Sequence, residues 1–147
     1  MSDNKKLREK YNDVYKNGKE SFFSRFSNGE DISETDKTVL ESINWVDKRV
    51  IDIGCGTGNT AARIAEIGAR SVLGIDYSSN AIKLANNRYS FDNLEFQVGS
   101  LKSLESSTEI FDIVTSLGTL EHMDDPKKSL RQMLKMVNEG GQVVLVC

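Results

Sequence analysis

The sequence predicts an α/β fold of the doubly wound type, in which a mainly parallel sheet has helices on both faces. Short apolar runs of strand length alternate with helical segments from residue 49 to the end of the chain. These runs are apolar at nearly every position, as in strands that are covered on both faces. Such alternation, with right-handed crossovers, is typical of parallel α/β sheets.

Five strands are expected, at residues 50–53, 71–75, 94–98, 111–116 and 143–146. Helices are expected between them, over about 59–67, after a cap at Ser78 or Ser79, and from Pro126 onward. Gly68 is expected to end the first of these helices, because glycine readily adopts the left-handed conformation found after many helices. The apolar face of the last helix is expected to carry Leu130, Met133, Leu134 and Val137, followed by a turn at Gly140-Gly141.

Residues 1–48 are expected to form a helical N-terminal lid ahead of this sheet. Apolar and aromatic residues recur at helical spacing over 3–17. The segment Ser33-Glu34-Thr35-Asp36 resembles a capping box at the start of a second helix, whose apolar face carries Val39, Leu40 and Ile43. With the core at 49–147, the whole chain of 147 residues fits a single domain.

Composition excludes several classes of protein. A hydrophobic content of 38% with 28% charged residues is typical of a globular domain with a real core. The net charge of −3 and the mixed signs near the N-terminus give no sign of a nucleic-acid partner. No apolar run approaches the about 18–20 residues that span a bilayer. Cys55 and Cys147 lack the spacing of a metal site, so we expect no metal and a reducing, cytoplasmic setting.

The most informative motif is a glycine-rich loop directly after the first strand. Gly54, Gly56 and Gly58 are spaced as G-x-G-x-G, with Asp52 two residues before them. A dinucleotide fingerprint would need its third glycine at Asn59, which argues against a nicotinamide cofactor. No Gly-Lys-Ser/Thr sequence follows, so the loop is not of the Walker type that holds nucleotide phosphates.

The segment Asp52-Ile53-Gly54-Cys55-Gly56-Thr57-Gly58 resembles the first motif of the class I S-adenosylmethionine-dependent methyltransferases. The resemblance continues at Asp76, which ends the second strand 24 residues after Asp52, at Gly99-Ser100-Leu101, and in the Phe111-Asp112 strand with the Leu120-Glu121-His122 segment after it. It covers roughly residues 49–146. It implies a Rossmann-like sheet of order 3-2-1-4-5 that binds S-adenosylmethionine.

By this resemblance, each matching residue acquires an expected role. Glycines let the backbone approach the cofactor closely because they lack a Cβ atom, and Asp76 would accept hydrogen bonds from the ribose hydroxyls. Ser100 stands where the family often has an aspartate near the adenine, which implies weaker binding. The expected cofactor contacts are Asp52, Gly54, Cys55, Gly56, Gly58, Asp76, Tyr77, Ser100, Leu101, Ser116, Leu117 and Arg25.

Several of these residues have an alternative, purely structural interpretation. Asp76 is also suited to the N-terminus of the next helix, and Ser100 is equally a common turn residue. Tyr11 and Tyr15 would line the lid or simply pack in its interior. His122, the only histidine, would accept a proton from the substrate as a general base, or would cap or orient the following helix.

Members of this family normally continue beyond the fifth strand, so the resemblance implies that C-terminal strands are missing here. Residues 143–146 would then form an exposed apolar edge, which favours either a shortened chain or a homodimer that pairs through this strand. We expect methyl transfer to a nucleophile on a small molecule. The alternative is a module or partner subunit that binds S-adenosylmethionine without independent catalysis.

Overall fold

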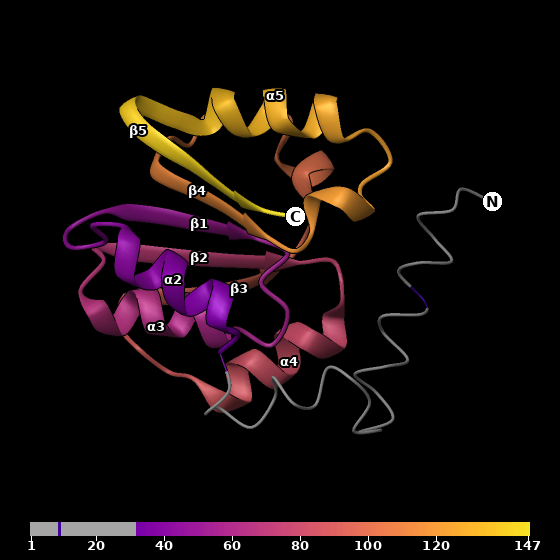
Figure 1. Cartoon of the computed structure of the whole chain (residues 1–147). Helices are drawn as coiled ribbons and strands as arrows, with labels where there is room; N and C mark the ends of the chain where they lie inside the picture. The colour runs from indigo at the N-terminus through magenta and orange to yellow at the C-terminus, as the bar shows by residue number, and fades with distance from the viewer. Residues whose placement is uncertain (1–8, 10–31) are drawn as a thin grey trace.

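The computed structural model describes Glu9 and residues 32–147 (Figure 1). Three residues with expected roles in the lid or in cofactor binding lie outside the described residues: Tyr11, Tyr15 and Arg25. Almost all of the helix expected over 3–17 lies outside them as well. No helix within the described part of the chain is both long enough and apolar enough to cross a membrane.

Five parallel strands form one sheet in the order β3-β2-β1-β4-β5, which confirms the expected topology. The chain leaves the central strand β1 toward β2 and β3 and then returns to the other side for β4 and β5. The carboxyl ends of all strands therefore meet at one edge of the sheet. The strands are β1 Arg49–Ile53, β2 Ser71–Asp76, β3 Leu94–Val98, β4 Phe111–Leu117 and β5 Val137–Val146.

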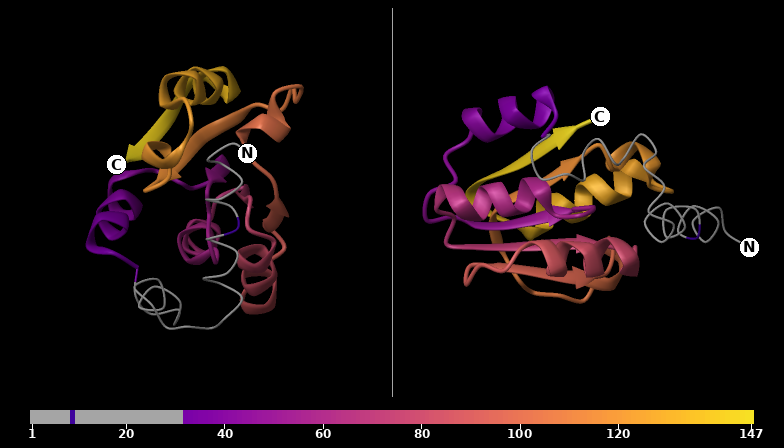
Figure 2. Two further views of the ribbon diagram at one scale, coloured as in Figure 1. Left: turned by 90° about the vertical axis from the view of Figure 1, so that its right-hand side faces the viewer. Right: turned by 90° about the horizontal axis from the view of Figure 1, so that it is seen from below.

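Helices cover both faces of this sheet, as Figures 1 and 2 show from three directions. Helices α2, α3 and α4 lie on one face and α5 lies on the other. The helices are α2 Glu34–Ser42, α3 Asn59–Ile67, α4 Ser79–Arg88 and α5 Pro126–Met136. Two short 3₁₀ turns, η2 Leu101–Leu104 and η3 Leu120–His122, follow β3 and β4.

The helix ends depend on the residues that the sequence pattern indicated. Ser33 Oγ accepts a hydrogen bond from Asp36 N at 3.0 Å, which caps α2. Ser78, and not Ser79, caps α4, because its Oγ accepts from Ala81 N at 3.2 Å. Gly68 ends α3 with φ 115°, in the left-handed region that favours glycine.

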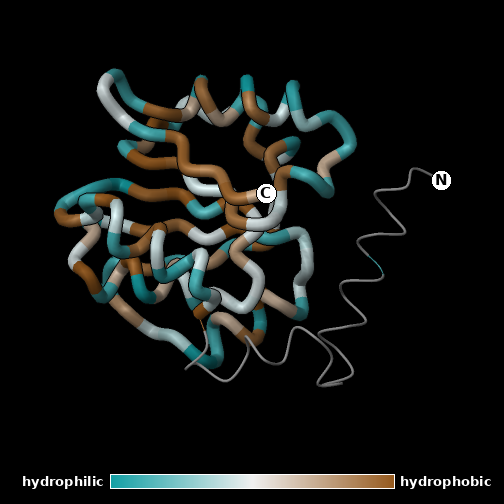
Figure 3. Tube along the Cα trace, viewed as in Figure 1, coloured by the Kyte–Doolittle hydropathy of each residue, from teal (hydrophilic) through white to brown (hydrophobic). Residues whose placement is uncertain are grey.

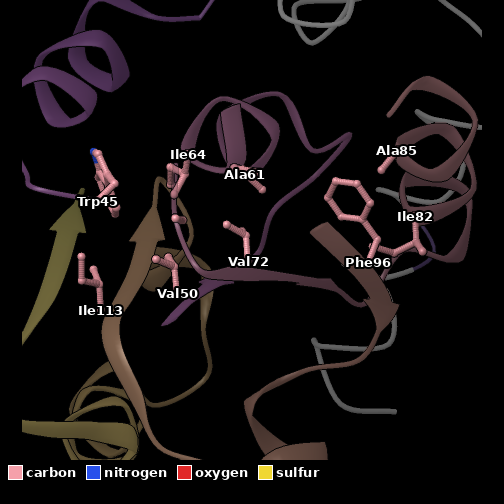
Figure 4. Close-up of a cluster of buried hydrophobic side chains, with 11 residues drawn as sticks. Trp45, Val50, Ala61, Ile64, Val72, Ile82, Ala85, Phe96 and Ile113 are labelled. Carbon is pink, nitrogen blue, oxygen red and sulfur yellow. The ribbon is translucent and has the colours of Figure 1, made fainter. Parts of the chain in front are cut away.

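Two apolar layers enclose the sheet, because the strand residues point alternately to its two faces. Figure 3 shows that hydrophobic residues concentrate along the strands. The layer under α3 and α4 contains Trp45 and Phe96 with aliphatic residues of β1 and β2 (Figure 4). The layer under α5 contains Met133 and Met136 packed against the isoleucines of β1.

The last helix and strand differ from the expectation. Leu134 was expected on the apolar face of α5, but 54% of its surface is exposed, and Met136 takes that place. Met136 lies three residues after the fully buried Met133 and so shares its side of the helix, whereas Leu134 is turned away by one residue. The helix ends at Met136, so Val137 belongs to β5 and not to α5.

Strand β5 also begins earlier than the sequence pattern predicted. Val137 already pairs with Phe111, and the register then shifts so that Gln142 pairs with Ile113. The Gly140-Gly141 pair therefore forms an irregularity inside the strand instead of a turn before it. Gly141 has no room for a side chain, because a Cβ atom there would collide with the carbonyl oxygen of Asp112 on β4.

Trp45 is expected to carry much of the stability of the α2 side of the molecule. Its side chain is 1% exposed, and Nε1 donates a hydrogen bond to Leu40 O at 2.9 Å. Trp45→Ala should lower the free energy of unfolding by about 3–5 kcal/mol, as for other large buried aromatics. Val46→Ala, at a neighbour that is 56% exposed, is the control and should change it by less than about 0.5 kcal/mol. Equal urea unfolding curves for the two variants would contradict this role.

Candidate active site

A cavity of about 800 Å³ opens at the carboxyl edge of the sheet. Its walls come from the glycine loop after β1, the residues after β2, β3 and β4, the start of α2, and one side of α5. Open parallel sheets bind their ligands at this edge, where the strand order changes direction. The volume lies within the range of small-molecule sites, about 300–1,000 Å³.

The glycine loop forms the floor of this cavity. Gly54, Gly56 and Gly58 have φ angles of 79°, 56° and 85°, a region that side chains strongly disfavour. The backbone N–H groups of Gly54 and Cys55 both donate to Ile75 O, at 2.8 and 2.9 Å. The loop is thus bound to the end of β2 while its upper side faces the cavity.

Packing inside the protein also requires two of these glycines. A Cβ atom on Gly54 would collide with the Thr119 side chain, and one on Gly58 would collide with the Phe96 ring. In the sequence, the resemblance explains the glycines by the close approach of a ligand. The structure adds a second reason, since the loop must also fit closely under the residues that follow β4 and against β3.

Asp76 joins the loop to the end of β2. Its Oδ2 accepts from Gly56 N and its Oδ1 accepts from Ser78 N, both at 2.9 Å. Burial raises the pKa of this carboxyl, although the two backbone hydrogen bonds oppose the rise. Each carboxylate oxygen has a further lone pair, so Asp76 can hold the loop and still accept hydrogen bonds from a ligand in the cavity that it lines.

Asp52 lies beneath the loop and does not line the cavity. It is 3% exposed, and its Oδ1 accepts from Thr115 Oγ1 on β4 at 2.7 Å. Burial raises the pKa of Asp52 to about 7, against the opposing effect of the Thr115 hydrogen bond, and the charges of Asp36 and Asp76 raise it further. Asp52 therefore links the two central strands at the point where the sheet changes direction.

The structure brings most of the expected site residues together around one cavity. Those that line it are Gly54, Cys55, Gly56, Asp76, Tyr77, Ser100, Leu101, Leu117 and His122. Asp52, Gly58 and Ser116 lie behind this lining, and Arg25 is outside the described residues. Ser116 is fully buried, and its Oγ has no hydrogen-bond partner among the described residues. Contact between these residues and a cofactor stays a prediction.

His122 lies at the end of η3 and lines the cavity. Its backbone N–H donates to Thr119 O at 3.0 Å, and half of its side chain is exposed. Nε2 is 3.8 Å from Glu121 Oε1, which makes a weak contact at most. Asp125, and not His122, caps α5, because its side chain accepts from Lys128 N. The imidazole is therefore available to a molecule in the cavity.

The start of α2, within the expected lid, also lines the cavity, through residues that the sequence pattern did not single out for this role. Asp36 Oδ2 accepts from Thr60 Oγ1 at 3.1 Å, so the two helices meet beside the glycine loop. On the opposite side, Gln132 of α5 donates to Leu101 O, and Lys128 Nζ lies 3.6 Å from Glu105 Oε1. Sequence spacing gave no signal for these residues, because each depends on the packing of a different helix.

Comparison with known proteins gives an independent view of the chain. Residues 46–146 match the model of a family described as a methyltransferase domain. The mitochondrial ubiquinone biosynthesis O-methyltransferase of Dictyostelium discoideum is 36% identical over 118 residues, which cover 72% of this chain and 35% of that protein. The ubiquinone biosynthesis O-methyltransferase of Pseudomonas fluorescens strain Pf0-1 is 37% identical over 111 residues, or 69% of this chain and 47% of that protein. The chain thus spans less than half the length of these two relatives.

Solved structures show the same fold at low sequence identity. Magnesium protoporphyrin IX methyltransferase from Synechocystis PCC 6803, with bound S-adenosylmethionine, has a TM-score of 0.72 and 18% identity, and the match covers 94% of this chain and 73% of that one. Phosphoethanolamine N-methyltransferase 1 of Haemonchus contortus has a TM-score of 0.74 and 22% identity, with 94% of this chain and 31% of that one covered. Their substrates differ widely, so the shared fold does not identify the acceptor.

The buried Asp52 should make stability depend on pH. Its pKa is about 7 in the folded chain and near 3.9 in an unfolded one, so the folded state binds the proton more tightly. The free energy of unfolding therefore falls as pH rises through this interval. Asp52→Asn cannot ionise, so its advantage over the parent chain should grow by about 2–3 kcal/mol between pH 5 and pH 8.

Urea unfolding at the two pH values measures this difference. Asp92→Asn, at an exposed position before β3, is the control and should follow the parent chain at both pH values. If Asp52→Asn and the parent chain lose stability in parallel, the side chain does not carry the proton that the structure indicates.

Proposed function

Because the chain belongs to the class I S-adenosylmethionine-dependent methyltransferases, we propose that it transfers a methyl group from this cofactor to a hydroxyl group of a small molecule. The observation that carries the proposal is that the glycine loop, Asp76 and His122 line one and the same cavity. A hydroxyl acceptor is favoured because the relatives described above are named O-methyltransferases. Such a reaction needs the cofactor-binding loop and a proton acceptor to lie close together.

The residues of the cavity fit S-adenosylmethionine. The glycine loop offers a backbone surface without side chains to the slim methionine part. The spare lone pairs of Asp76 suit the two ribose hydroxyls. Ser100 and Leu101 lie past the end of β3, where the adenine would rest, and the Ser100 backbone is held by Ser103 Oγ at 2.9 Å. Leu117, at the end of β4, would border the methionine part.

The chemistry that the cofactor supplies is a methyl group activated by a sulfonium. The main task of the chain is therefore alignment of the acceptor oxygen, which can contribute about 7–11 kcal/mol to barrier lowering. His122 would accept the hydroxyl proton at an imidazole nitrogen as the oxygen attacks, which typically adds about 10²–10⁴-fold in rate. Alignment is the larger contribution, so the absence of a catalytic triad from the motifs does not argue against an enzyme.

A second candidate function is a module that binds S-adenosylmethionine but works only with a partner. The uncharged Ser100 favours it, because this residue stands where the family often has a carboxylate. Binding of cofactor without methyl transfer to any acceptor would support this alternative. Turnover by the chain alone would exclude it.

Four expectations from the sequence belong to the same proposal. The lid over residues 1–48 is supported by the start of α2, where Ser33 and Asp36 line the cavity. A homodimer through β5 is supported by the position of this strand at the edge of the described sheet, where it pairs with β4. A cytoplasmic location and the absence of a nucleic-acid partner are supported by cysteine usage and by the net charge of −3.

Asp76 should be essential for cofactor affinity. Asp76→Ala removes the acceptor for the ribose hydroxyls and frees the Gly56 N–H, so binding of S-adenosylmethionine should weaken at least about tenfold. Calorimetric titration with S-adenosylmethionine and S-adenosylhomocysteine measures this change. Asp92→Ala is the exposed control and should bind like the parent chain. A folded parent chain that binds neither compound would contradict the proposed function.

His122 should affect methyl transfer and not cofactor binding. His122→Ala is expected to lower kcat by about 10²–10⁴-fold on a hydroxyl acceptor, because no other imidazole is present. The dissociation constant for S-adenosylmethionine should stay within about twofold, since half of the His122 side chain is exposed to solvent and it is not part of the glycine loop. The acceptor is first found by testing small phenols and alcohols with the parent chain. An unchanged kcat would give His122 a structural role instead.

A further inference from the structure

We propose that Asp36, at the start of α2, binds the ammonium group of the methionine part of S-adenosylmethionine. The inference rests on the proposed function, because it needs this cofactor in the cavity. It adds to Arg25, the contact expected from the segment ahead of the sheet, a residue that the sequence indicated only as part of a helix cap. Four observations carry it: the position of Asp36, its lack of a cationic partner among the described residues, the charge around the loop, and the anchoring of α2.

Asp36 is positioned beside the glycine loop by two contacts. Its backbone N–H donates to Ser33 Oγ at 3.0 Å, and its Oδ2 accepts from Thr60 Oγ1 at 3.1 Å. Thr60 lies in the first turn of α3, directly after the loop, and both Asp36 and Thr60 line the cavity. A hydroxyl that occupies one carboxylate oxygen orients the group and leaves its charge available to a ligand.

The other carboxylates that line the cavity have described roles with one exception, Asp124, which also has an interaction of its own. Asp76 accepts two backbone N–H bonds, Asp125 caps α5, and Glu105 lies 3.6 Å from Lys128 Nζ. Within residues 32–147, no cationic side chain forms an ion pair with Asp36. A partly buried carboxylate without a counter-charge is suited to a cationic ligand group.

The chemistry of the cofactor decides which group Asp36 would bind. Adenine and ribose are neutral at pH 7, so only the sulfonium and the ammonium are cations. An ammonium has three N–H donors and can hydrogen-bond a carboxylate, whereas a sulfonium has none. Asp36 also acts on its surroundings: its charge is among the causes that raise the pKa of Asp52, after burial. An ammonium beside Asp36 would offset this accumulation of negative charge.

The rest of α2 holds Asp36 in place. Val39, Leu40 and Ile43 pack against the apolar layer under α3, and the Trp45 side chain fixes the far end of the helix. The helix therefore lies over the core by its apolar side, and its first turn reaches the cavity. This arrangement gives the lid expected over residues 1–48 a specific chemical contact with the cofactor.

Asp36→Asn tests the proposal, because an asparagine Oδ1 can still accept from Thr60 while the negative charge is lost. Calorimetric titrations of the full chain use S-adenosylmethionine, S-adenosylhomocysteine and 5′-methylthioadenosine, which has the adenosine and a thioether but no amino-acid part. We expect the first two to bind about tenfold more weakly, as for the loss of one charge-assisted hydrogen bond, and the third to bind unchanged.

Glu34→Gln is the matched control on the same helix. Glu34 is highly exposed, pairs with Lys37 at 2.8 Å and does not line the cavity. All three ligands should therefore bind the Glu34→Gln variant as tightly as the parent chain. Unchanged or tighter binding of S-adenosylmethionine to Asp36→Asn would overturn the inference, since tighter binding indicates that Asp36 faces the ligand carboxylate. Equal weakening of all three ligands would also overturn it. A parent chain that binds none of them would reject the proposed function and the inference together.

Discussion

The attachment of the glycine loop to the end of β2 is the interaction on which the rest of the site depends. Two N–H groups of the loop donate to Ile75 O, and Asp76 accepts a third hydrogen bond from Gly56 N. These bonds turn the chain sharply at the end of β1 and hold the first turn of α3 over the sheet edge. Only residues without a side chain tolerate the backbone angles and the close contacts that this turn requires.

Three aspartates surround this loop, and they affect both the stability of the fold and the charge of the cavity. Asp52 joins β1 to β4 below it, Asp76 holds it from β2, and Asp36 approaches it from α2. Burial raises the pKa of Asp52 and of Asp76, and the nearby charges of Asp36 and Asp76 raise the pKa of Asp52 further. The same arrangement creates a field that favours a cationic ligand. Binding of a positively charged cofactor at this site can therefore offset part of the free energy that the fold loses by burying these carboxylates.

Local sequence patterns predicted the fold well where the pattern itself holds the physical cause. The first four strands lie within one residue of the expected positions, because a strand covered on both faces must be apolar throughout. Gly68 ends α3 and Pro126 opens α5 as expected, since both signals act through the backbone of one residue. The predictions for Leu134 and for the start of β5 were wrong, because the end of a helix depends on what packs against it. Here the deciding contacts involve Met133, Met136 and the backbone of β4.

For the active site, the sequence by itself determined the glycine loop, the position of Asp76 at the end of β2 and the topology, because the spacing of glycines and of apolar runs reflects backbone geometry directly. The tertiary structure decided which of those residues reach the cavity. It placed Asp52, an expected cofactor contact, below the loop, and it placed Asp36, which the sequence indicated only as part of a helix cap, beside the loop. The reason is that Asp36 and Thr60 meet only when α2 packs on α3, a contact between residues 24 positions apart that no local pattern encodes.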